Sequence, residues 1–314
     1  MRRLIQFFTL QLTVCTVLAA QTRPHSLPSH PGAMLVDLDG FDVTQSSAKP
    51  GGVELGLRVH DHGNTGALIF LFLTPQTPHQ DAASCLQNEL KQVRKDMAED
   101  FKDVKLNPDS KDSESHATML ITGKNGQYLY GFYGQGDQCL LVEAYPDTGT
   151  SLDLHTASLF LGRQRYDPNY APVSADKFLY ASILYRTQQY GASVPIYGDF
   201  LKSISEGQKD QNLRRVATDN MGMAMGISGD VDGARKVFQD AIKTDPDYPL
   251  YYYNLACADA EQGKAADAKL HLQQAFDRRA NTLPGEHMPD PTTDNSILKL
   301  KKNKEFWTFV QDLK

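Results

Sequence analysis

Apolar residues in the second half of the chain recur at steps of three and four from Ala175 onward, which is the period of amphipathic helices. Two stretches of this half superimpose at a spacing of 34 residues, and small residues match small ones while large residues match large ones. The matched pairs are Gly222 with Ala256, Gly229 with Gly263, Ala234 with Ala268, Phe238 with Leu272 and Ala241 with Ala275. Repetition at this period is typical of helical hairpins that bury their apolar faces by stacking on one another.

This order of small, large and small residues resembles the tetratricopeptide repeat (TPR) family, with regular repeats at 215–248 and 249–282. The resemblance implies an all-α array of hairpins over 175–314. Residues 175–205 would form a degraded first hairpin, and 296–313 would cover the other end of the stack. We expect Gly229 and Gly263 to end the first helix of each repeat, because glycine readily adopts the left-handed conformation found after a helix.

The first half of the chain has a different pattern. Polar and apolar residues alternate over 53–59, and 67–73 is an unbroken apolar run, which predicts two strands. The helical period returns over 81–97. Three more strands, separated by glycine-containing turns, are predicted at 117–122, 128–134 and 139–145, and a short helix at 151–161. The sequence therefore predicts an α+β domain at 34–165, an antiparallel sheet with a packed helix, and a proline-rich linker at 166–174. Its element order is topologically similar to PsbP-like domains.

The chain begins with Arg2 and Arg3, an apolar stretch over 4–20 and small residues at the end of that stretch. These features predict a secretory signal peptide at 1–20, followed by a flexible lead at 21–33. The mature protein would be exported to the periplasm or the extracellular space, without stable membrane insertion after signal cleavage. The alternative is a membrane anchor that is not cleaved, since the apolar stretch approaches the length needed to span a bilayer.

The formal net charge of the chain is -6, and removing the predicted signal peptide would shift it to about -8, because two arginines and no acidic residue are lost. An acidic chain is a poor ligand for nucleic acid or anionic lipid. The lysine-rich run at 299–304 is an exception, which we interpret as a solvated helix face.

In TPR arrays the first helix of each hairpin lines a concave groove. Carried onto this chain, the groove positions are Val216, Asp219, Asn220 and Met223 in one repeat and Leu250, Tyr253, Asn254 and Cys257 in the next. The predicted partner-binding residues are Asp219, Asn220, Met223, Tyr253 and Asn254. The two asparagines coincide in the repeats, and their amides could clamp the backbone of an extended peptide. Alternatively, they bond within their own stack.

Other candidate chemistry is sparse. His60-Asp61-His62 resembles part of a metal or acid-base site, but it lies where a strand meets a turn, and a turn is the simpler interpretation. Cys85 and Cys139 are the candidate pair for a disulfide between the predicted helix and a strand. The sequence thus favours a non-enzymatic interaction protein with a protein or peptide partner and without catalytic residues, cofactor or metal. The alternative is that the α+β domain is a hydrolase or a small-ligand or metal binder that the repeats position.

Overall fold

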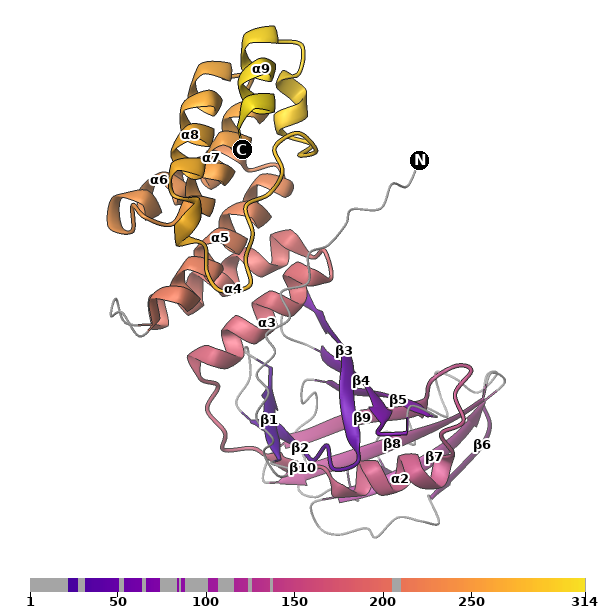
Figure 1. The fold of residues 1–314 in the computed structure, drawn as a ribbon. Coiled ribbons are helices and arrows are strands. Elements are labelled where there is room, and N and C mark those ends of the chain that lie inside the picture. The colour runs from indigo at the N-terminus through magenta and orange to yellow at the C-terminus, as the bar shows by residue number, and fades with distance from the viewer. Residues whose placement is uncertain are drawn as a thin grey trace. The chain divides into compact units, whose positions relative to one another are not determined.

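A computed structural model of the chain describes residues 22–27, 32–50, 54–63, 66–73, 84, 86–87, 101–106, 116–123, 126–135, 138–204 and 210–313 (Figure 1). These residues fall into two compact units, which we call the sheet unit, up to Gln189, and the helical unit, from Tyr190 onward. The predicted signal peptide, Cys85 and most of the predicted helix at 81–97 lie outside the described residues, as does the side chain of Cys139. The candidate disulfide therefore stays a prediction.

The sheet unit contains a seven-stranded antiparallel sheet in the order β3-β4-β5-β9-β8-β7-β6. Its strands are β3 Phe41–Lys49, β4 Glu54–Asp61, β5 Ala67–Leu73, β6 Phe101–Leu106, β7 His116–Gly123, β8 Gly126–Gln135 and β9 Gln138–Pro146. The five strands predicted from the sequence are present. β5 lies inside the sheet, where Phe70 is fully buried. The antiparallel sheet of the predicted α+β class is therefore confirmed, whereas the likeness to PsbP-like domains stays a prediction.

The two strands at the edges of this sheet, β3 and β6, are absent from the sequence prediction. Most of the polar residues in the middle of β3 are exposed, because an edge strand needs to bury few of its side chains. A strand of this kind lacks the alternation by which its neighbours were recognised. Sequence reasoning therefore missed the polar edge strand β3.

A second, three-stranded sheet has the order β1-β2-β10, with β1 Arg23–Ser26, β2 Ala33–Val36 and β10 Arg165–Asp167. β1 lies within the predicted flexible lead, and β10 overlaps the start of the predicted linker, so both expectations differ from the structure. β2 explains the difference, since Met34 and Val36 are fully buried and both neighbouring strands pair with its backbone. Segments rich in proline are ordered here because they complete a sheet.

Two helices complete the sheet unit: α2 Leu154–Arg163 and α3 Ser174–Arg186. Phe160 of α2 packs edge-on against Phe41 and Phe70, with ring centroids 5.0 and 5.5 Å away. The hydroxyl of Tyr180 in α3 donates a hydrogen bond to the carbonyl oxygen of Lys49, the last residue of β3. α3, which the sequence assigned to the helical array, thus contacts the sheet and belongs to the sheet unit.

The helical unit contains helices α4 Tyr190–Ser203, α5 Gln211–Ile227, α6 Val231–Thr244, α7 Pro249–Glu261, α8 Ala265–Asp277 and α9 Lys304–Asp312, with short 3-10 helices η3 Arg279–Asn281 and η4 Ile297–Leu300. α5 with α6 and α7 with α8 are the two successive hairpins predicted at 215–248 and 249–282. Gly229 and Gly263 follow α5 and α7 with φ of +98° and +72°, as predicted. The fold is thus an α+β unit followed by a TPR-like helical array. Within the described part of the chain, we find no helix with the length and apolar character needed to cross a membrane.

In each hairpin the two helices pack closely together, but the pair of residues at the contact differs between the hairpins. In the first, α5 approaches the ring of Phe238 so closely that a Cβ added to Gly222 would lie 2.4 Å from Cζ of that ring. In the second, the matched residues are Ala256 and Leu272, both fully buried in one apolar cluster. A large ring thus requires glycine opposite it, whereas the smaller leucine leaves room for alanine.

We expect Gly222→Ala to lower the free energy of unfolding by about 1–3 kcal/mol, because the buried ring of Phe238 cannot yield and this overpacking exceeds the gain in helix propensity. Gly226→Ala is the matched control on the same helix, since its Cβ would meet Ala234 at an ordinary 3.7 Å. The control should be neutral or stabilising in urea unfolding. Equal effects of the two substitutions would contradict this packing.

Candidate functional site

The five predicted partner-binding residues lie on α5 and α7. Asp219 and Tyr253 are buried, with exposed fractions of 7% and 1%. Asn220, Met223 and Asn254 are half-buried. The structure thus brings these residues onto neighbouring helices but leaves two of them inaccessible to a partner.

The two asparagines make bonds between neighbouring helices. Nδ2 of Asn254 donates to Oδ1 of Asp219 at 2.6 Å, which links α7 to α5. Nδ2 of Asn220 donates to the hydroxyl of Tyr197 at 3.1 Å, which links α5 to α4. Of the two interpretations that the sequence left open, this structure contains the bonds within the stack.

α7 is buried on nearly all sides, and part of its cover comes from the segment 282–296, which we call the strap. The strap connects η3 to η4 (Figure 1). Leu283 packs against the apolar cluster that includes Tyr251, and Met288 packs against the cluster that includes Tyr253. Pro291 is buried as well. The chain therefore lays its own segment against the helix that was predicted to line the groove.

The strap begins with a tight turn, Leu283-Pro284-Gly285-Glu286. The amide of Glu286 donates to the carbonyl oxygen of Leu283 at 2.9 Å, and Gly285 has φ of +85°. Proline at the second position and glycine with positive φ at the third are the features of a type II turn. This turn directs the side chains of Leu283 and Glu286 toward α7.

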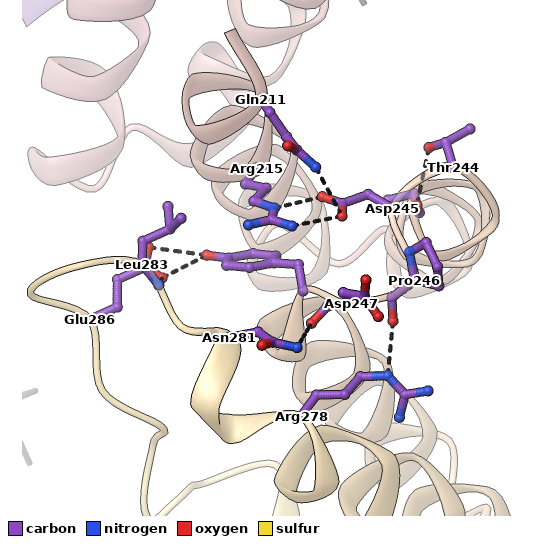
Figure 2. Close-up of polar contacts among 12 residues, drawn as sticks. Gln211, Arg215, Thr244, Asp245, Pro246, Asp247, Arg278, Asn281, Leu283 and Glu286 are labelled. Atoms are coloured by element: carbon purple, nitrogen blue, oxygen red, sulfur yellow. Dashed lines mark hydrogen bonds and ion pairs between the residues drawn. The ribbon is translucent and has the colours of Figure 1, made fainter. Parts of the chain in front are cut away.

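Glu286 is the main polar anchor of the strap. Its two carboxylate oxygens each lie 3.0 Å from the hydroxyl of Tyr248, which donates to them, and one of them also accepts from the amide of Leu283 at 3.1 Å (Figure 2). Arg215 lies over the face of the Tyr248 ring, with its guanidinium carbon 5.2 Å from the ring centroid. Arg215 is itself held by Asp245 through two hydrogen bonds of 2.6 and 2.8 Å (Figure 2). The tyrosine that receives the strap is therefore fixed in place.

The buried Asp219 of α5 is in an unusual electrostatic environment. Burial and, to a lesser extent, the negative charge of Glu286 together raise the pKa of Asp219 from 3.8 to about 7, while the hydrogen bond from Asn254 acts in the opposite direction. Burial also raises the pKa of Tyr248, to which the charges of Asp219 and Glu286 add. The closed strap thus places a carboxylate near a second carboxyl group that prefers to stay protonated.

Near its C-terminal end the strap is held by Asp294. Oδ1 of Asp294 accepts hydrogen bonds from the amides of Ser296 at 2.9 Å and Ile297 at 3.2 Å, at the start of η4. The thiol of Cys257 lies 3.8 Å from the same oxygen. Burial and the charge of Asp294 raise the pKa of Cys257, which makes a reactive thiolate unfavourable.

The candidate metal group of the sheet unit forms a turn. Oδ1 of Asp61 accepts from the amide of Gly66 at 3.1 Å, closing the connection between β4 and β5. The exposed His62 lies with Nε2 3.7 Å from Oδ2 of Asp42. Among the residues that the structure describes, no group of three or more histidine, cysteine, aspartate or glutamate side chains is placed to hold a metal.

Sequence reasoning missed the strap residues Leu283, Glu286 and Asp294. The Leu-Pro-Gly-Glu turn is visible in the sequence, because proline followed by glycine is a strong turn signal. The sequence does not indicate that this turn returns to the face of α7, since the contact depends on how the two hairpins stack. The strap over α7 is therefore an element that the sequence analysis did not include, and the partner-binding groove stays a prediction.

The class of protein defined by this geometry is an α+β unit joined to a TPR-like array. No known protein family and no curated protein matches the chain. Among solved structures, the chain is similar to the TPR domain of Sgt2 from Aspergillus fumigatus, with 15% identity over 45% of this chain and 83% of that one, at a TM-score of 0.33.

The chain is also similar to PcrH from Pseudomonas aeruginosa, with 9% identity over 45% of this chain and 90% of that one, at a TM-score of 0.32. A third similar structure is MamA MSR-1 C2, with 16% identity over 33% of this chain and a TM-score of 0.29. The match spans only 56% of that MamA chain. These likenesses are too distant to bear on function, which has to be inferred from the chain's own geometry.

Proposed function

We propose that this chain is an exported, non-enzymatic interaction protein whose helical unit binds a segment of a partner polypeptide along α5 and α7. The observation that carries the proposal is the strap: this face already receives a polypeptide segment, through one carboxylate and apolar side chains. A surface that binds one such segment has the donors and apolar pockets for another. Export is supported by the signal-like pattern at 1–20.

The half-buried residues of α5 are where a partner would first make contact. Asn220 and Met223 are accessible in part, and Val216 lies one turn before Asn220. Asn254 would be reached only as the partner extends toward α7, where the buried Asp219 holds its side chain through a hydrogen bond. The sheet unit would then serve as the body that carries the helical array.

The proposal is tested by capture from an envelope extract of the source cells, with the full chain as bait. We expect Val216→Arg/Asn220→Arg to reduce recovery of a groove-dependent partner by about tenfold or more, because two long charged side chains would block α5. The matched control is Gln239→Arg/Gln273→Arg, which adds the same charges at exposed positions of α6 and α8. Thermal unfolding checks that both variants are folded. Equal recovery by the bait, the groove variant and the control would reject groove binding.

A further inference from the structure

The strap has two faces of opposite character. The residues directed toward the helices are Leu283, Glu286, Met288, Pro291 and Asp294, all buried or half-buried. The residues directed toward water are Pro284, Gly285, His287, Pro289, Asp290, Thr292, Thr293 and Asn295, all exposed. This alternation is typical of a peptide ligand lying in a groove, in which one side contacts the receptor.

The ends of the strap are anchored independently of its middle. Before the strap, Nδ2 of Asn281 donates to the carbonyl oxygen of Asp247 at 3.2 Å. After it, Ile297 is fully buried within the apolar cluster of α7, α8 and α9. The middle of the strap could therefore lift from α7 while both ends remain attached to the fold.

The middle of the strap is also held at an electrostatic cost. Glu286 gains the hydroxyl of Tyr248, but its negative charge interacts unfavourably with that of Asp219 when both groups are ionised. The site thus binds a carboxylate, although the charge of Asp219 weakens its hold on the carboxylate of Glu286. A competing segment that makes the same contacts has to overcome the effective concentration of the tethered strap, so the strap sets the affinity that a partner needs.

We propose that the strap is an internal ligand, and that the partner segment which displaces it has the same chemistry: an acidic stretch in which a leucine and a glutamate, three residues apart, flank a Pro-Gly turn. The leucine enters the pocket of Leu283, and the glutamate accepts from Tyr248. This inference rests on the proposed function and specifies its ligand. The ligand is a polypeptide because the strap, which occupies the site in this structure, is itself a polypeptide.

The test uses a fluorescent synthetic peptide with the sequence of residues 280–296, titrated into the full chain. We expect it to bind Leu283→Ser/Glu286→Gln, in which the strap is weakened, at least about tenfold more tightly than the unaltered chain. The matched control is His287→Ala/Asn295→Ala, which alters the exposed face of the same strap and should bind the peptide as weakly as the unaltered chain does. A peptide that itself carries Leu283→Ser/Glu286→Gln should not bind.

Hydrogen exchange of the strap amides determines how a negative result is interpreted. If the strap of Leu283→Ser/Glu286→Gln exchanges freely and the peptide still does not bind, the proposal is overturned. The proposal is also overturned if the strap amides of this variant stay protected from exchange. It is likewise overturned if this variant and the milder Glu286→Gln both unfold globally. In either case the strap would be a fixed part of the fold. The titration needs no partner. If the peptide does not bind while capture of a partner still depends on Val216 and Asn220, the proposed ligand chemistry is wrong and the proposed function stands.

Discussion

Arg235→Met is expected to lower the free energy of unfolding by about 3–5 kcal/mol, because it leaves a buried carboxylate without its main partner. Asp259 of α7 is fully buried and forms an ion pair with Arg235 of α6. Its other oxygen lies 2.6 Å from Nδ1 of His271 on α8. One side chain thus joins three helices, and removing the arginine affects both hairpins at once. Urea unfolding at neutral pH measures the loss.

The control for Arg235→Met is Lys236→Met, because Lys236 is the next residue along α6 and its side chain is 78% exposed. Its ion pair with Asp240 lies on the surface and contributes little, so the control should change stability only slightly. Similar losses of stability for the two variants would contradict a larger contribution from the buried ion pair than from the exposed one.

His271 adds a pH signature to the same experiment. Burial lowers the pKa of His271, the charge of Asp267 acts in the opposite direction, and the charge of Arg235 lowers it further. Removing the arginine should therefore raise the pKa of His271, whose protonated ring could then partner Asp259. The loss in Arg235→Met should accordingly be smaller at pH 5.5 than at pH 8.

Asp219→Asn is expected to remove a pH dependence of stability that the unaltered chain shows. The pKa of Asp219 is raised from 3.8 to about 7 in the folded chain, so above pH 4 the folded state holds a proton that the unfolded state has released. Rising pH therefore favours unfolding across this window. Between pH 5 and 8 the unaltered chain should lose roughly 3 kcal/mol relative to the asparagine variant.

Several groups around Asp219 bear on this prediction. Glu286 of the strap and the hydroxyls of Tyr248 and Tyr251 interact with it electrostatically, as does the thiol of Cys257. Because burial raises the pKa of Tyr248, Tyr251 and Cys257 as well, these three stay protonated over the pH range tested.

The control for Asp219→Asn is Asp240→Asn. Asp240 is accessible, and hydrogen bonds from Lys236 and Lys243 lower its pKa to about 2, below the range tested. This control should leave the slope between pH 5 and 8 unchanged. An equal dependence of stability on pH in the unaltered chain and in Asp219→Asn would contradict the raised pKa of Asp219. The protection factors of the strap amides, which are corrected for the intrinsic pH dependence of exchange, should also fall with rising pH in the unaltered chain, since ionised Asp219 repels Glu286.

The sequence predicted the parts of the fold that repeat or alternate. The repeat that matches Gly229 with Gly263 placed four helices, because each unit buries an apolar face on its neighbour. The run over 67–73 placed β5 at its observed bounds, because an interior strand is apolar on both sides. Segments that only border the core, such as β1 and β3, carry no such pattern. Their strand pairing depends on neighbours that are distant in the sequence.

The candidate site was predictable only in part, for a related reason. The resemblance to TPR arrays placed Asp219, Asn254 and Tyr253 on the first helices of successive hairpins, which are neighbours in the structure. It could not indicate that Asn254 bonds to Asp219 across two helices, nor that Glu286 returns to Tyr248. Those contacts join residues 35 and 38 positions apart, respectively, and depend on the stacking of complete hairpins.

The pairing of Gly222 with Phe238 and of Ala256 with Leu272 also bears on how the two hairpins are related. Although their backbones follow the same plan, each inner helix is fitted to its own outer helix. Exchanging α6 with α8 would set Phe238 against Ala256, which is too crowded, and Leu272 against Gly222, which leaves a void. The two copies are therefore not interchangeable modules, and any substitution that enlarged one member of a pair would need a matching reduction in the other.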